Sequence, residues 1–173
     1  ISDAQGNLLF ITNGVEVFLG ASIGISIYPD QGQSVDEIFQ HADAALYQAK
    51  KEGKGIFRYY NSSITSMIRN RLSIETRLRK AIDRGELLVY FQPQVEITTG
   101  AIVGAEALVR WKDPVNGFIS PAEFIPIAEE SGIIGSIGEW VLRQVCAIGY
   151  KWQQEGLKLV PLAVNLSPRQ FIY

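Results

Sequence analysis

Several residue types and patterns are scarce in this chain of 173 residues. No apolar run approaches the roughly 20 residues of a spanning helix, so we expect no membrane segment in it. The start, ISDAQGNLLF, lacks the basic segment and apolar core of a secretion signal and is typical of the interior of a longer chain. The single cysteine, Cys146, excludes an intramolecular disulfide. Its apolar helical surroundings predict a packed thiol in a reducing compartment, with the cytoplasm as the expected location. A membrane anchor elsewhere in a longer parent protein stays open.

Neither sign of charge is in large excess, because 16 Lys and Arg residues against 18 Asp and Glu residues give a formal net charge of −2. This balance gives no general attraction to nucleic acid or to an anionic membrane. The basic side chains between positions 69 and 84 predict a solvated face on a connecting helix, since no aromatic groups alternate with them to stack on bases. We therefore expect no nucleic-acid polymer as a partner. The composition that is present, 47% apolar and 20% charged, is typical of a globular protein with a core.

The first half of the chain predicts a strand followed by a helix. Residues 16–29 are rich in β-branched and aromatic side chains and end in a Pro-Asp-Gln-Gly turn, and Gly24 within them indicates a close backbone approach. Ser34, with Glu37 three residues later, predicts the start of a helix that runs up to Gly53. Helical spacing of apolar residues predicts a second helix over residues 63–84.

The second half changes rhythm after Gly85. Residues 87–97 and 101–111 predict two strands joined by a short glycine-containing loop. Ser120, Pro121 and Glu123 predict a capped helix that ends at Gly132, and another helix is expected over residues 136–156. Residues 159–166 predict a further strand, and the capping pattern from Ser167 predicts the start of a helix. Strand, helix and strand in alternation indicate the opening of a parallel α/β layer.

One carboxylate, Glu106, stands inside the apolar stretch GAEALVRW, residues 104–111. A buried carboxylate without a partner costs several kcal/mol or becomes protonated, so Glu106 requires one. Glu106 and Asn165 both fit the C-terminal ends of strands, where reactive residues gather in parallel layers. Their oxygens suit Mg²⁺, Mn²⁺ or Ca²⁺, and no Cys/His cluster is present for a softer metal. The alternative pairs Glu106 with Arg110, four residues away on the same strand face, and makes Asn165 a helix cap; spacing favours neither.

Ordered blocks in both halves resemble known families. The blocks VYFQPQVEITTGAIVGAEALVRWKDPVNGFISPAEFIPIAEESG, WVLRQVC and AVNLSPRQF resemble the N-terminal portion of an EAL domain, over most of residues 76–173. SIGISIYPDQG and HADAALYQAKKEGKG resemble the C-terminal portion of a GGDEF domain. The resemblance implies an α/β fold class: part of a GGDEF-type α/β domain (1–60), a connecting helix (61–85) and the first part of an EAL-type (β/α)8 barrel (86–173).

The EAL resemblance also implies an activity, the hydrolysis of cyclic di-GMP to pGpG with Mg²⁺ or Mn²⁺. Glu106 and Asn165 fall on the family's catalytic metal-ligand positions. Gln92 matches its ligand-contacting glutamine, and Leu108 and Arg110 match positions that line the dinucleotide site. Without the resemblance, Gln92 is a strand-end amide bonded to backbone and Leu108 a core residue. A homodimer through the EAL domain is a further expectation.

In the GGDEF-like half, Lys50 and Lys54 match basic positions that hold the nucleotide phosphate. Their spacing of four places them on one helix face, and two solvated lysines are the alternative. His41, on the same helix, is expected to be structural or at the surface, because no acidic partner is evident. The GGDEF signature itself does not occur in this sequence, so we expect no cyclase activity from it.

Three functions therefore stay open for a longer parent protein. The first is an EAL phosphodiesterase, favoured because the positions of Glu106, Asn165 and Arg110 are filled. The second is a catalytically degenerate receptor for cyclic di-GMP, and the third is an interaction or regulatory module. A barrel of this kind takes about 250 residues. Since the sequence ends before the family's further metal carboxylates, we expect this stretch alone to be inactive.

Overall fold

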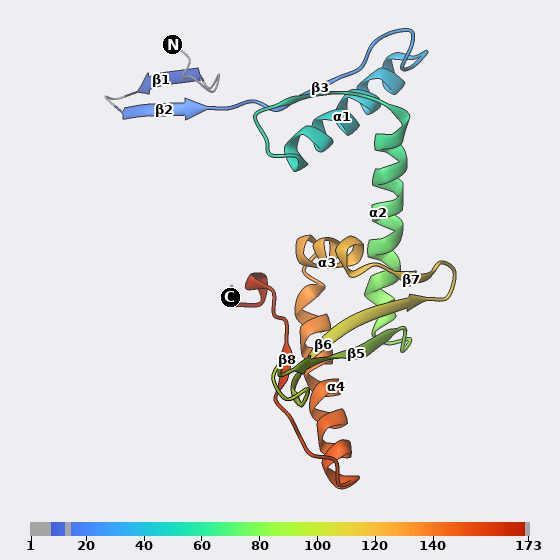
Figure 1. Cartoon of the computed structure of the whole chain (residues 1–173). Coiled ribbons are helices and arrows are strands. Elements are labelled where there is room, and N and C mark those ends of the chain that lie inside the picture. Colours follow the sequence, from blue (N-terminus) through green and yellow to red (C-terminus); the bar gives the residue numbers. More distant parts are fainter. Residues whose placement is uncertain (1–7, 13–14, 172–173) are drawn as a thin grey trace. The chain divides into compact units, whose positions relative to one another are not determined.

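A computed structural model describes residues 8–12 and 15–171 of the chain (Figure 1). The chain divides into two compact units, Ile1–Asn70 and Arg71–Tyr173, and the division falls inside helix α2 (Ser62–Ala81). The predicted helix over residues 63–84 is confirmed by α2. The domain boundaries at residues 60 and 85 stay predictions. Among the described residues, none of the helices is long and apolar enough to cross a membrane.

The first unit contains two separate pairs of strands. Strands β1 (Leu8–Thr12) and β2 (Val15–Leu19) are antiparallel, whereas β3 (Ile23–Ile25) pairs in parallel with β4 (Phe57–Tyr59). The prediction of one strand over residues 16–29 is therefore wrong. Residues 20–22, a run of Gly, Ala and Ser, lie outside both strands, and these small residues have low β-propensity.

Helix α1 (Val35–Lys51) packs on β3 as the sequence predicts. Ser34 is its N-cap, and the Ser34 side chain accepts a hydrogen bond from the Glu37 backbone N–H at 3.2 Å. Gly24 on β3 makes the predicted close approach, because an added Cβ would lie only 2.0 Å from the carbonyl oxygen of Ala42 on α1. Only glycine permits this contact between strand and helix.

A small core joins α1 to the start of α2 in this unit. Ala45, Tyr60 and Ile64 are its buried members. The ring of His41 stacks on that of Tyr60 with 3.8 Å between centroids, and its Nδ1 lies 2.5 Å from the carbonyl oxygen of Gln31. His41 therefore has a structural role, as expected.

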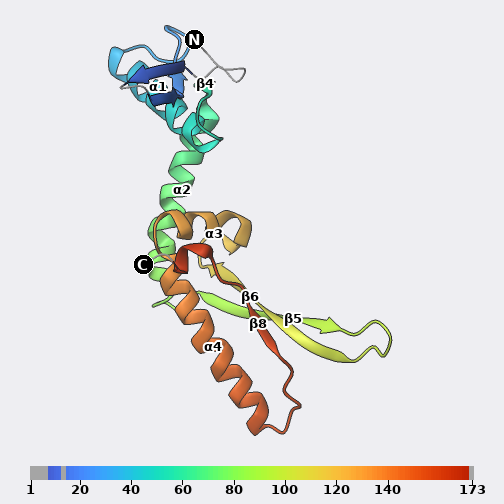
Figure 2. The same cartoon turned by 90° about the vertical axis from the view of Figure 1, so that its left-hand side faces the viewer.

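The second unit is built on a four-stranded sheet (Figure 2). Strand β6 (Ile102–Asp113) is antiparallel to β5 (Leu87–Val95) on one edge. On its other edge it pairs with β7 (Gly117–Ile119), antiparallel, and with β8 (Leu162–Val164), parallel. The predicted hairpin and parallel strand are confirmed, while β7 was not predicted.

Helices cover one face of this sheet. They are the end of α2, α3 (Pro121–Glu130) and α4 (Ile134–Gln154). Trp111 of β6, Phe124 of α3 and Leu78 of α2 are fully buried in the core that they form. Ser120 is the N-cap of α3, but its side chain makes no capping hydrogen bond, so the predicted capping box does not form.

Two expectations about the helices are wrong. Cys146 is exposed, although a packed thiol was expected. The buried stripe of α4 includes Val141, Val145 and Gly149, and Cys146, which directly follows Val145, lies off this stripe and faces away from the core. The chain after Ser167 forms the short 3-10 helix η1 (Pro168–Phe171) in the described residues, in place of a capped α-helix.

The basic residues of α2 are not simply a solvated face, which corrects a further expectation. Arg71 pairs with Glu130 of α3 at 2.5 Å, and Arg77 pairs with Asp113 at 2.6 Å. The Asp113 side chain is only 1% exposed, and the Arg77 guanidinium also lies 5.6 Å from the centre of the Trp111 ring. Arg77 thus ties α2 to the far end of β6.

Candidate functional site

The alternation of β6 divides its side chains between two environments. Ala105, Ala107 and Trp111 are buried, and Ala107 and Trp111 belong to the core with the helices. Glu106, the first of the predicted site residues, and then Leu108 and Arg110 stand at the intervening positions and share the opposite face. The strand is therefore buried on one side only, and Glu106 is half-buried.

Three predicted polar residues from neighbouring strands meet on that open face. Gln92 of β5 lies directly opposite Glu106 in the antiparallel register, and Ala163 of β8 lies opposite Glu106 on the other edge. Asn165 follows β8 two residues after Ala163 and so returns to the same face. Its Nδ2 donates a hydrogen bond of 2.6 Å to Oε1 of Glu106.

The partner of Glu106 in this structure is therefore Asn165. In the described part of the chain, Glu106 makes no ion pair with Arg110, so the pairing alternative from the sequence is wrong. Asn165 does not cap η1 with its side chain either; Ser167 accepts from the Arg169 backbone N–H at 3.3 Å. Asn165 lies directly after the end of β8, as expected for a strand end. The same expectation for Glu106 is wrong, because Glu106 lies within the long strand β6, at the segment that pairs with β8.

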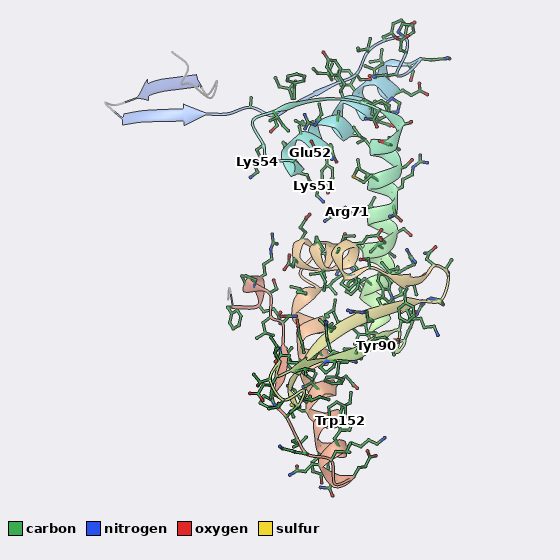
Figure 3. The ribbon with its side chains drawn as sticks, viewed as in Figure 1. Lys51, Glu52, Lys54, Arg71, Tyr90 and Trp152 are labelled. Carbon is green, nitrogen blue, oxygen red and sulfur yellow. The ribbon has the colours of Figure 1, made fainter. Side chains whose placement is uncertain are left out.

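Arg110 occupies the same face as Glu106, nearer to the end of β6. Its Nη1 donates to the carbonyl oxygen of Val109 at 2.9 Å, and its guanidinium lies 5.9 Å from the ring centre of Tyr90 on β5. Tyr90, labelled in Figure 3, is half exposed, and its ring meets that of Phe118 edge-on at 6.3 Å. Sequence reasoning missed Tyr90, although strand alternation places it on the face of Gln92.

A cavity of about 290 Å³ adjoins this face, where the sheet meets the turn after β8. Leu108, Arg110 and Asn165 line it together with Glu129 of α3 and Ser167. The Ser167 hydroxyl donates to Glu129 Oε1 at 2.7 Å. Leu108 is half-buried and lines the cavity. It is therefore not one of the fully buried core residues, which was the alternative for this position. Glu129 was also missed, because its role depends on a contact 38 residues away in the chain.

The donor set on this face fits a hard divalent cation in part. Glu106 offers carboxylate oxygens and Asn165 an amide oxygen, and Mg²⁺ binds to such ligands while it keeps several waters. Within the part of the chain that the structure describes, no three His, Cys, Asp or Glu side chains gather as a metal site. Glu106 and Asn165 therefore supply two ligands, and water or further groups must complete the coordination.

The lysines predicted to contact phosphate lie elsewhere, in the first unit. Lys50 is exposed in the last turn of α1, but Lys54 lies beyond the helix (Figure 3). Gly53, Lys54 and Gly55 have φ of 131°, 61° and 64°, which ends the helix before Lys54 is reached. The expectation that both lysines share one helix face is therefore wrong.

Two protein-family models match parts of the chain. Residues 75–172 match the EAL domain, and residues 5–55 match the family described as diguanylate cyclase, GGDEF domain. The chain is 40% identical over 158 residues to the bifunctional diguanylate cyclase/cyclic di-GMP phosphodiesterase MucR of Pseudomonas aeruginosa, covering 91% of this chain and 23% of MucR. It is 38% identical over 156 residues to the cyclic di-GMP phosphodiesterase PdeR of Escherichia coli, covering 90% and 23%. The chain thus spans just under a quarter of the length of these relatives.

Solved structures agree with the EAL match. The complex of PaMucR phosphodiesterase with c-di-GMP is 41% identical and superimposes with a TM-score of 0.53, over 55% of this chain and 38% of that one. The Xanthomonas citri FimX EAL domain, in complex with c-diGMP, is 23% identical with a TM-score of 0.53, over 62% and 41%. EAL domains of this kind are (β/α)8 barrels, so the predicted fold class, with part of such a barrel, is confirmed.

Proposed function

Because this chain belongs to the EAL domain family, we propose that it is part of a phosphodiesterase that hydrolyses cyclic di-GMP to pGpG with Mg²⁺ or Mn²⁺. The observation that carries the proposal is the meeting of Gln92, Glu106 and Asn165 from three adjacent strands on one open face. The family implies a divalent metal, and the choice of ion is part of the proposal.

Each residue of the face has a distinct task in this proposal. Glu106 would hold the ion through a carboxylate oxygen and Asn165 through its amide oxygen. When bound, the ion polarises the phosphodiester and activates water. Arg110 binds a phosphate, because a planar guanidinium can donate two parallel hydrogen bonds to it. Gln92 contacts the ligand by its amide, and Leu108 supplies an apolar wall.

The present position of Asn165 is compatible with this task. Its Nδ2 already lies 2.6 Å from Glu106, so its amide is within reach of any ion that the carboxylate binds. A rotation of the amide about its terminal bond would exchange the nitrogen for the oxygen at nearly the same place. The arrangement therefore needs no backbone movement to offer two oxygens.

The test uses the intact gene product and the variant Glu106→Gln, which removes the charge and keeps the shape. We expect metal-dependent hydrolysis to be lost while thermal unfolding stays nearly unchanged, with pGpG measured by ion-exchange chromatography. Glu96→Gln is the matched control, since Glu96 accepts a hydrogen bond from Thr99 in the loop after β5, away from the site. Wild-type turnover by Glu106→Gln in limiting Mg²⁺ would exclude Glu106 as a ligand.

Cyclic di-GMP binding without hydrolysis by the wild type would instead support the receptor alternative, and calorimetry separates the two outcomes. If the wild-type protein does not bind cyclic di-GMP, the third function, an interaction or regulatory module, would be the one supported. A cytoplasmic location and a homodimer through the EAL domain are further parts of the proposal, and fractionation and size-exclusion chromatography test them.

For the GGDEF-like residues, the proposal keeps Lys50 and Lys54 as phosphate contacts, although they come from a helix and from the loop after it. Both side chains are exposed, which leaves them accessible to a phosphate. A double alanine variant should weaken nucleotide binding by this part of the protein. Unchanged binding would return both lysines to the solvated alternative.

A further inference from the structure

The segment that carries Asn165 has little regular structure of its own. Strand β8 is only three residues long, and Asn165 and Leu166 follow it as exposed residues. A metal ligand must nevertheless be held close to one geometry, and its supporting contacts commonly decide the affinity of the site. The turn between β8 and η1 therefore depends on contacts with other elements to hold Asn165 in place.

Glu129 binds this turn at two points from the end of α3. Its carboxylate Oε1 accepts a hydrogen bond of 2.7 Å from the Ser167 hydroxyl. Its backbone carbonyl accepts a second bond of 2.9 Å from Nη1 of Arg169. Both Glu129 and Ser167 are half-buried, so the bond between them is partly shielded from water.

The turn is also closed by its own bonds. The Ser167 backbone N–H donates to Oε1 of Gln170 at 2.9 Å, and the Gln170 N–H donates to the carbonyl oxygen of Ser167 at 3.0 Å. The Gln170 side chain lies against Gly138 of α4, where an added Cβ would stand 2.0 Å from Nε2. Ser167, two residues after Asn165, is thus the point at which the contacts from α3 and the turn meet.

The end of α3 that carries Glu129 is itself anchored. Glu130, the next residue, forms an ion pair with Arg71 of α2, and Figure 3 shows Arg71 on α2 beside α3. Arg71 is only 17% exposed, which makes this pair less mobile than a fully solvated one. Glu129 therefore projects from a fixed helix end onto the turn.

We propose that Glu129 is a positioning residue, which sets Asn165 beside Glu106 through the Ser167 hydroxyl. This inference rests on the proposed function, because it gives a role to the ligand assigned there. Glu129 itself does not contact the ion. Removal of its carboxylate leaves the Ser167 hydroxyl without its acceptor and frees the turn to move, so the two ligand oxygens are no longer held together.

The experiment compares four variants of the intact protein: Glu129→Ala, Glu129→Gln, Ser167→Ala and the double variant Glu129→Ala/Ser167→Ala. Mn²⁺ binding is measured directly by calorimetry in the absence of substrate. We expect Glu129→Ala and Ser167→Ala each to weaken Mn²⁺ binding about tenfold, the lower end of the usual effect of supporting contacts. Glu129→Gln should restore most of the affinity, because its amide oxygen still accepts from Ser167.

Two features separate positioning from a general loss of stability. The double variant should bind Mn²⁺ no more weakly than Ser167→Ala, since both changes break the bond between Glu129 and Ser167, and Ser167→Ala also removes the acceptor of the Arg169 N–H. Glu139→Ala is the matched control, because Glu139 lies on α4 in an exposed ion pair with Arg143, and its Mn²⁺ affinity should match the wild type. Additive losses, or an equal loss in Glu139→Ala, would overturn the proposal.

Hydrogen exchange gives a second measurement that needs neither metal nor substrate. The backbone amides of positions 167 and 170 are hydrogen-bonded within the turn. Both amides should exchange faster in Glu129→Ala and Ser167→Ala than in the wild type or in Glu129→Gln. Unchanged exchange in both alanine variants would overturn the positioning role. If the wild type binds no Mn²⁺ but the exchange changes as expected, the metal assignment fails while the control of the turn by Glu129 stands.

Discussion

The ion pair between Arg77 and Asp113 should contribute strongly to the stability of the second unit. Asp113 is almost completely buried, and its Oδ1 accepts hydrogen bonds from the backbone N–H groups of Val115 at 3.0 Å and Asn116 at 2.7 Å. Its Oδ2 faces Nη1 of Arg77 at 2.6 Å. The perturbation that isolates the charge is Asp113→Asn, which keeps the shape and one oxygen acceptor.

The magnitude follows from the surroundings of the two charges. Breaking a fully buried pair costs about 3–5 kcal/mol, because the remaining charge has no partner. The Arg77 side chain is 23% exposed and regains part of its hydration, so we expect a loss of about 2–3 kcal/mol. For a unit of about 100 residues, that loss corresponds to a melting temperature about 8–24 °C lower.

The pH dependence supplies a sharper test. Burial alone would raise the pKa of Asp113, but the backbone hydrogen bonds from Asn116 and Val115 and the ion pair with Arg77 outweigh it and lower the pKa below its ordinary value. A carboxylate with a lowered pKa stabilises the folded state above the unfolded pKa of about 3.9 and loses this contribution as the pH falls through the folded value. The difference between wild type and Asp113→Asn should therefore be full at pH 7 and shrink below pH 4.

Urea unfolding followed by tryptophan fluorescence measures this effect in the second unit, since Trp111, Trp140 and Trp152 all lie there. Glu139→Gln is the control, because its pair with Arg143 is exposed and should contribute little. Equal unfolding midpoints of wild type and Asp113→Asn at pH 7 would refute the reasoning. So would a difference that persists unchanged at pH 3.

Three further outcomes are expected. Arg110→Ala should weaken cyclic di-GMP binding at least tenfold in calorimetry, since a charged hydrogen bond to phosphate contributes about 1.5–3 kcal/mol; unchanged affinity would leave Arg110 with its contacts to Val109 and Tyr90. Gly24→Ala should strongly destabilise the first unit, because the new Cβ would stand 2.0 Å from the carbonyl oxygen of Ala42, and a wild-type thermal melt would contradict that packing. Cys146 should react with a thiol reagent in the folded protein at nearly the rate of a free thiol, and a protected thiol would contradict its exposure.

Local patterns in the sequence predict much of this fold. Apolar alternation and the glycine-containing loop predict the hairpin of β5 and β6, and helical spacing predicts α4 close to its observed bounds. The cap at Ser34 forms as predicted because donor and acceptor are three residues apart. Each of these features is decided within a short stretch of chain.

Features that depend on distant residues could not be predicted in the same way. Arg77 and Asp113 are separated by 36 positions, and nothing local to either residue indicates the other. Glu129 and Ser167 are likewise brought together only by the parallel crossover from β6 to β8. For Glu106, the sequence indicated that a partner was needed, but the choice of Asn165 over Arg110 required the register of β8 against β6.

The exposure of Cys146 was predictable in principle. The apolar positions 137, 141 and 145 of α4 define its buried stripe, and position 146 lies about 100° around the helix from position 145. Apolar surroundings in the sequence do not by themselves place a residue on that stripe.

Strand β6 carries Glu106, Leu108 and Arg110 on its open face and Ala105, Ala107 and Trp111 among its buried positions, and this alternation determines which genetic changes it tolerates. Substitution at Leu108 alters the open face and leaves Trp111 in the core. Insertion or deletion of one residue within the strand would exchange the two sets, bringing Glu106 toward the helices and an alanine to the open face. Among natural variants of this protein, β6 should therefore keep its length even where its side chains differ.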